Sequence, residues 1–160
     1  MNRRHAVTGT IGAAQAPGRN PEPSVRKQLI GVWKLLRLEL LVDGNVLYPY
    51  GEHPLGRLTY DEAGRISAQI MQPGRQSSLS DPDAISRASA HELRQIAEGY
   101  FGYYGSFTID EENKTVIHHV EACTLPAWVG TDQKRRWEFE GPRLVLRSGP
   151  NKLVWERLPD

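Results

Sequence analysis

TVIHHVEACTLPAWVGTDQKRRWEF, residues 115–139, holds the most varied chemistry of this 160-residue chain. Two runs with strand character, residues 115–123 and 131–140, flank a connection that contains Pro126 and Gly130. Successive side chains of a strand face opposite sides, so two such strands in a closed sheet point alternate residues into one interior. The stretch therefore predicts part of a barrel with an internal cavity.

Side-chain alternation sorts these residues into an inner and an outer face. In residues 115–123, one face is apolar apart from His118, and we predict that this face lies inside. In residues 131–140, every second residue from Asp132 onward is charged and is predicted to face solvent, which leaves Arg135 on the inner face. The other inner residues of that run are Gln133, Trp137 and Phe139. The remaining reactive groups are predicted to lie outside or to serve in packing: His119, Glu121, Arg136 and Cys123.

Two interpretations stay open for each polar residue predicted to lie inside. His118 is either a core histidine satisfied by a hydrogen bond or an imidazole that exchanges protons near neutral pH. An unpaired buried Arg135 is costly, so it either pairs with a carboxylate such as Glu39 or meets an anionic or carbonyl ligand.

Length and composition limit the classes of protein to which the chain can belong. The length predicts one domain with a single core. The formal net charge of +1 argues against a nucleic-acid or membrane-surface protein, which would concentrate basic residues on one face. The single cysteine rules out an intrachain disulfide. Cys123 is interpreted as a small packing residue rather than a nucleophile.

The beginning of the sequence differs from the rest. Residues 1–24 are rich in Gly, Ala, Pro and polar residues without a period, which predicts a disordered tail before a barrel domain at 25–160. The early arginines are not followed by the apolar run of a signal peptide. No run approaches the ~20 apolar residues of a membrane helix. We therefore expect a cytoplasmic protein with no membrane insertion.

Short strands separated by turn sequences fill most of the remaining chain. Their number, eight to nine, together with one mid-chain helix, predicts a mainly β, antiparallel barrel, with a β-sandwich as the alternative. The helix is predicted within residues 83–104, where Ser89 and Glu92 have the spacing of a capping box. We expect this helix to cover one mouth of the barrel or to pack on its outer wall. Its predicted apolar stripe is Leu93, Ile96, Ala97, Tyr100, Phe101 and Tyr104.

Several local motifs occur in a fixed order along the chain. They are Gly31-x-Trp33, Tyr48-Pro-Tyr-Gly, Leu58-x-Tyr60, Gly64-x-Ile-Ser-Ala-Gln, Val116-Ile-His-His-Val-Glu, Pro126-x-Trp-x-Gly-Thr-x-Gln and Trp155-Glu-Arg. Together they resemble the lipocalin-like domain family of stand-alone bacterial and fungal proteins, over about residues 29–158. The resemblance implies a calycin-type barrel with an internal pocket and no single reaction.

Three functions are consistent with such a barrel. The first is binding of a small, largely apolar ligand. The second is a cofactor-free cyclase or isomerase acting on a polyketide-like or other secondary-metabolite intermediate, in which His118 is the acid/base and Arg135 stabilises an oxyanion or carboxylate. The third is an interaction domain with a filled interior. The predicted ligand-binding residues are Trp33, Tyr60, Gln69, Met71, Trp128, Gln133, Trp137 and Phe139.

The sequence gives no support for a cofactor or a metal. His118 and His119 diverge to opposite faces of a strand, so they do not meet at one ion. No glycine-rich nucleotide motif and no Gly-x-Ser-x-Gly nucleophile elbow is present. The expected partner is a small hydrophobic molecule rather than a nucleic acid, and a homodimer is left open.

Overall fold

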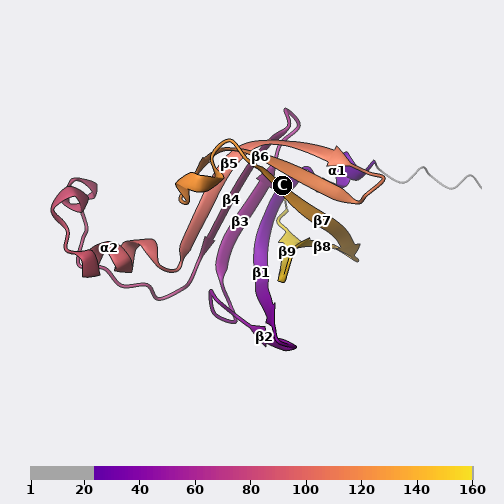
Figure 1. Ribbon diagram of the computed structural model, residues 1–160. Helices are drawn as coiled ribbons and strands as arrows, with labels where there is room; N and C mark the ends of the chain where they lie inside the picture. Colours follow the sequence, from indigo (N-terminus) through magenta and orange to yellow (C-terminus); the bar gives the residue numbers. More distant parts are fainter. Residues whose placement is uncertain (1–23, 160) are drawn as a thin grey trace, which may run out of the picture.

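Nine antiparallel strands form one sheet in the computed structural model, which describes residues 24–159 (Figure 1). The strands are β1 (Gly31–Val42), β2 (Asn45–Leu47), β3 (Leu55–Tyr60), β4 (Arg65–Met71), β5 (Tyr100–Asp110), β6 (Thr115–Cys123), β7 (Asp132–Glu140), β8 (Arg143–Ser148) and β9 (Asn151–Arg157). The helical segments of this part are α1 (Val25–Leu29), η1 (Pro82–Arg87), α2 (Ala90–Ala97) and η2 (Pro126–Trp128). The tail predicted for residues 1–24 lies outside the described residues except for Ser24.

The sheet closes because β1 pairs with β3 on one side and with β9 on the other. Trp33 lies opposite Leu58 of β3 and opposite Arg157 of β9. The short β2 pairs only with residues 40–42 of β1, so eight of the nine strands form the barrel and β2 extends β1 beyond it. The predicted antiparallel barrel is confirmed, and the β-sandwich alternative is wrong.

Two β-bulges set which side chains face the interior. In β1 the extra residue is Leu36, which lies between Leu35 and Arg37 where the register with β9 shifts. Trp33 and Leu35 are buried before the bulge and Leu38 after it, so the inward side changes parity within one strand. This change explains why both faces of the run are partly apolar in the sequence. The second bulge is at Glu121 of β6, opposite Tyr104 and Gly105.

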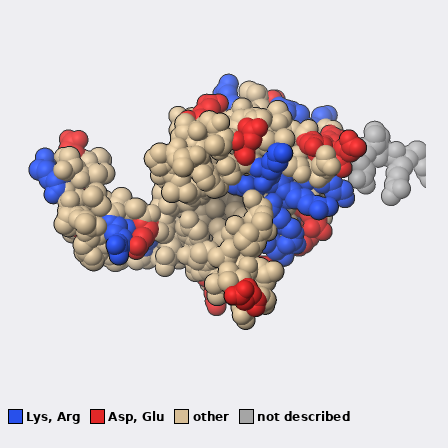
Figure 2. All heavy atoms as spheres, in the orientation of Figure 1, with Lys and Arg blue, Asp and Glu red and all other residues tan. Residues whose placement is uncertain are grey.

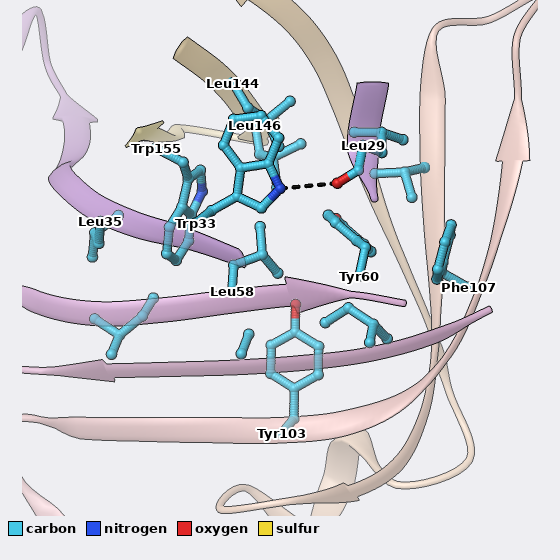
Figure 3. Packing of buried hydrophobic residues seen from close by; sticks show 14 of the residues in the cluster. Leu29, Trp33, Leu35, Leu58, Tyr60, Tyr103, Phe107, Leu144, Leu146 and Trp155 are labelled. Carbon is cyan, nitrogen blue, oxygen red and sulfur yellow. Dashed lines mark hydrogen bonds between the residues drawn. The ribbon is translucent and has the colours of Figure 1, made fainter. Parts of the chain in front are cut away.

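One end of the barrel is closed by α1. Leu29 is fully buried, and its carbonyl oxygen accepts a 2.9 Å hydrogen bond from the indole Nε1 of Trp33 (Figure 3). Arg157 places its guanidinium over the Trp33 ring, 4.2 Å from the centroid, and donates to the backbone oxygens of Ile30 and Gln28. These contacts hold α1 against the strands.

The segment between β4 and β5 extends away from the barrel in Figure 1, carrying η1 and α2. The capping box is confirmed, because Ser89 accepts from the Glu92 amide while Glu92 accepts from the Ser89 amide. The predicted helix ends at Ala97, and the apolar residues from Tyr100 to Tyr104 belong to β5 instead. The expectation that the helix covers a mouth or packs on the wall is wrong, since α2 contains no buried residue. Arg75 anchors its last turn by donating to the Glu98 and Gln95 backbone oxygens.

None of the helices within residues 24–159 is both long and apolar enough to span a membrane.

Replacing Ser89 by alanine is expected to loosen α2 without changing the melting temperature of the barrel. The substitution removes the side-chain acceptor of the N-terminal amide, and no buried contact of α2 compensates for its loss. Amide hydrogen exchange within α2 should accelerate about fivefold, in line with the usual effect of losing an N-cap. Ser86→Ala serves as the control, because the Ser86 hydroxyl bonds Asp83 within η1. Unchanged exchange in α2 would show that the capping box does not stabilise it.

Candidate functional site

A cavity of about 390 Å³ occupies the barrel interior toward the end away from α1. Figure 2 shows a hollow in this face of the molecule, and uncharged residues form most of its rim. The lining is mainly apolar and comes from β1, β3 to β9, η2 and the segment after β2. The lining residues are Leu38, Leu40, Pro49, Tyr50, Leu58, Ala68, Ile70, Phe101, Tyr103, His118, Trp128, Gln133, Arg135, Leu146, Ser148, Asn151, Leu153 and Trp155.

His118 is held between two tyrosines inside the barrel. The Tyr60 hydroxyl lies 2.6 Å from its Nε2, and the Tyr103 hydroxyl lies 2.7 Å from its Nδ1. All three side chains are buried, at 1%, 1% and 7% exposure for His118, Tyr60 and Tyr103. A neutral imidazole has one N–H and one free lone pair, so one hydroxyl donates to the ring and the other accepts from it. Figure 3 shows the Tyr103 hydroxyl directed between Leu58 and Tyr60.

Burial keeps this trio uncharged. It lowers the pKa of His118 to about 3, and the nearby Arg135 charge adds to the effect. Burial also raises the pKa of Tyr60 well above its usual value, with a further rise from Tyr103. The pKa of Tyr103 is raised by burial, while the charge and hydrogen bonding of Arg135 act in the opposite direction. His118 is therefore neutral at pH 7, with both ring nitrogens hydrogen-bonded.

Arg135 lies on β7 with its side chain in the cavity wall and is 9% exposed. Its Nη1 donates to the Lys134 backbone oxygen at 3.0 Å and to the Ser148 hydroxyl at 3.1 Å. Its guanidinium carbon lies 5.6 Å from the centroid of the Trp128 ring. The suggested partner Glu39 pairs instead with Arg37 and Lys152 on the barrel's outer side.

Four of the predicted site residues line the cavity: His118, Arg135, Trp128 and Gln133. They come from β6, β7 and η2, all within the stretch at 115–139. Side-chain alternation places the three strand residues, His118, Gln133 and Arg135, toward the interior, and η2 brings Trp128 to the same cavity. Their roles in binding or catalysis stay predictions.

The other six predicted residues do not line the cavity. Trp33 and Tyr60 face inward but pack in the closed end near α1. Tyr60 does not line the cavity, but its hydroxyl is hydrogen-bonded to His118, which does. Gln69 and Met71 alternate with Ala68 and Ile70, which point inward in their place because the apolar face of β4 is the buried one. The last two, Trp137 and Phe139, pack against the core and border a separate surface hollow beside Lys114.

Tyr103 is the functional candidate that sequence reasoning missed. It lines the cavity and bonds His118, but its run was assigned to a helix. Strand alternation from Phe107 backward would have placed it inward, since Phe107, Gly105 and Tyr103 are all buried. Tyr50, Ser148 and Asn151 lie in turn regions or at strand ends, where alternation gives no guidance.

His119 lies on the outer face, as predicted. His119 Nδ1 lies 2.6 Å from Asp132, and its Nε2 lies 2.9 Å from the Thr108 hydroxyl, whereas Glu121 is displaced by the bulge. Within residues 24–159, no group of three or more His, Cys, Asp or Glu side chains is arranged to hold a metal ion. Cys123 packs against the core next to Tyr103.

Comparison with known proteins gives matches of three kinds: a family profile, a curated relative and a solved structure. The profile of the lipocalin-like domain matches residues 30–157. A protein of Aspergillus oryzae (strain ATCC 42149 / RIB 40), named 4'-hydroxy-3'-methoxypropiophenone carrier protein ppsC, is 35% identical over 110 residues, which cover 59% of this chain and 97% of that protein. The crystal structure of a lipocalin-like protein from Bacteroides uniformis ATCC 8492 aligns with a TM-score of 0.48 and 14% identity, over 82% of this chain and 99% of the other.

Proposed function

We propose, because the chain belongs to the lipocalin-like domain family, that its barrel binds and carries a small, largely apolar molecule. Family membership confirms the resemblance drawn from the ordered motifs. It implies an internal pocket, while the ligand has to be argued from the residues of this chain.

The cavity is the observation that supports binding most directly. Its volume of about 390 Å³ is within the range of small-molecule sites, and a few polar groups converge on a mainly apolar lining. A barrel that served only as an interaction module would fill this space with side chains. Phe101 and Trp128 meet edge to face at 5.0 Å at the rim and offer flat surface to a ring.

The Aspergillus relative supports the same function. It is named as the carrier of a propiophenone, a phenyl ketone with hydroxyl and methoxy substituents. We extend to this chain the general class that the name describes, an aromatic molecule with oxygen substituents. The cavity has the matching parts, namely aromatic walls from Trp128 and Phe101 and polar groups at Tyr103, Gln133 and Arg135.

Carriage is favoured over the cyclase or isomerase alternative by the state of His118. A general base works best with a pKa near the working pH, and the pKa of His118 is about 3. Both of its nitrogens are already hydrogen-bonded to Tyr60 and Tyr103. The trio instead resembles a fixed structural network that places one tyrosine hydroxyl at the cavity wall.

Filling the cavity is expected to abolish ligand binding while the barrel stays folded. Leu153→Trp places an indole in the space from a partly buried lining position, and Ala68→Phe does so from the opposite wall. Fluorescence titration with 8-anilinonaphthalene-1-sulfonate should show one saturable site in the parent chain, with at least ~10-fold weaker binding in each variant. Ala97→Phe, on the exposed face of α2, is the control and should bind the probe like the parent. Retained affinity in both cavity variants would disprove binding in the barrel.

A further inference from the structure

We infer that the ligand carried by the barrel is an organic anion, an apolar ring body with one acidic group that pairs with Arg135. The inference rests on the proposed binding function and specifies the charge of the ligand. It follows from the charge of the cavity wall, where the described residues provide a cation, Arg135, and no anion to pair with it.

Arg135 is a buried cation whose neighbours are all neutral. Its hydrogen bonds go to the Lys134 backbone oxygen and the Ser148 hydroxyl, and it also interacts with the hydroxyl of Tyr103, which burial keeps protonated. Within residues 24–159, no Asp or Glu forms an ion pair with it. A buried charge without a counter-charge is destabilising, so this cation favours a bound molecule that supplies the opposite charge.

The rest of the lining adds no negative charge. Among the described residues around the cavity there is no carboxylate, and Arg135 is the only lining residue with a formal charge, because His118 is neutral. The cavity wall therefore carries a net charge of about +1 in a region of low dielectric. An anionic group would interact there far more strongly than it does in water.

The polar groups of the wall also favour a ligand that accepts hydrogen bonds. A guanidinium has five N–H donors and no acceptor, and the bonds to Lys134 and Ser148 use only its Nη1. Carboxylate, sulfonate and phenolate oxygens accept from such donors in a forked geometry.

The neighbourhood of the guanidinium suggests how the body of the ligand lies. Trp128 covers Arg135 at 5.6 Å and itself contacts Phe101 and Tyr103. The acidic group would meet Arg135 near Ser148, while the ring body extends along the apolar side chains of Leu38, Ile70 and Leu153. A fully apolar ligand of the same size would leave the cation buried and unpaired.

Two probes that share one aromatic body test the inference. 8-Anilinonaphthalene-1-sulfonate carries a sulfonate, and N-phenyl-1-naphthylamine is the same skeleton without it. In Arg135→Met we expect the sulfonate probe to bind at least ~10-fold more weakly and the uncharged probe to change less than about threefold, so the ratio of the two dissociation constants shifts by at least about threefold. Arg135→Lys, which keeps the charge and loses the fork, should give an intermediate shift.

Arg136→Met is the matched control, because Arg136 is the next residue of β7 and is exposed on the opposite face. It should leave the ratio unchanged. An unchanged ratio in Arg135→Met, or an equal shift in Arg136→Met, would overturn the inference while binding itself stands. The proposed function fails separately, if neither probe loses affinity in Leu153→Trp and in Ala68→Phe. Thermal unfolding of unliganded Arg135→Met should occur at the parent's temperature or higher, and a variant that does not fold would contradict a ligand-directed role.

Discussion

Gly105→Ala is expected to destabilise the barrel by at least about 3 kcal/mol, a large share of the 5–15 kcal/mol typical of a domain. Gly105 lies on β5 opposite the β6 bulge, where the two backbones approach closely. A Cβ at this position would lie 1.9 Å from the His119 carbonyl oxygen and 3.0 Å from the Glu121 amide nitrogen. Both atoms belong to the backbone of β6, so relief requires the bulge itself to move.

Gly102→Ala on the same strand is the matched control. Its new Cβ would lie 3.1 Å from the Tyr100 hydroxyl, the end of a flexible and partly exposed side chain. We expect a change within about 1 kcal/mol, since alanine also lowers the entropy of the unfolded chain. Urea unfolding followed by tryptophan fluorescence measures both variants. Similar unfolding midpoints for the two would mean that the bulge tolerates a side chain at position 105. The sulfonate probe would add a second readout, because movement of β6 displaces His118.

Side-chain alternation predicted the interior of β6 and β7 correctly and failed where a bulge changes the register. His118 and Arg135 lie on the uninterrupted parts of their strands, so counting by two places both inward. In β1 the extra residue Leu36 reverses the parity, and the sequence shows only a run with two partly apolar faces. A bulge depends on the pairing of two strands, and a single run of residues carries little trace of it.

The location of the cavity along the barrel axis could not be predicted. Trp33 and Tyr60 are aromatic and inward-facing, as a ligand contact would be, yet α1 closes their end of the barrel. The Arg157 contacts that fix α1 join parts of the chain separated by more than a hundred residues. Tyr103 was missed for a different reason, because apolar residues after Leu93 fit the helical period as well as the strand period.

Acidification from pH 7 to pH 5 is expected to destabilise the protein by about 2 kcal/mol through His118 alone. The ordinary pKa of 6.5 applies in the unfolded chain, and burial lowers the pKa to about 3 in the folded barrel. Between these values the unfolded state binds the proton and the folded state does not, so stability falls as the pH falls. The geometry also predicts that protonating His118 destabilises the folded state, because the charged imidazole would lie in an apolar interior near the Arg135 cation.

His118→Gln isolates this contribution, because glutamine keeps a donor and an acceptor for Tyr60 and Tyr103 and does not titrate. The ionisable groups next to His118 are Tyr60 of β3, Tyr103 of β5 and Arg135 of β7. All three are present in both the parent and the variant, so the difference between the two proteins reports on His118. The carboxyl groups of Glu92 and Asp110 have pKa values lowered by hydrogen bonds from Ser89 and Asn113, so they act mainly below pH 5 and equally in both proteins. Urea unfolding at pH 7 and pH 5 should show the ~2 kcal/mol loss in the parent and little of it in the variant. Equal losses of stability in the two proteins would mean that the pKa of His118 is not lowered in the folded barrel. The low pKa could then no longer be used to argue against His118 as a general base.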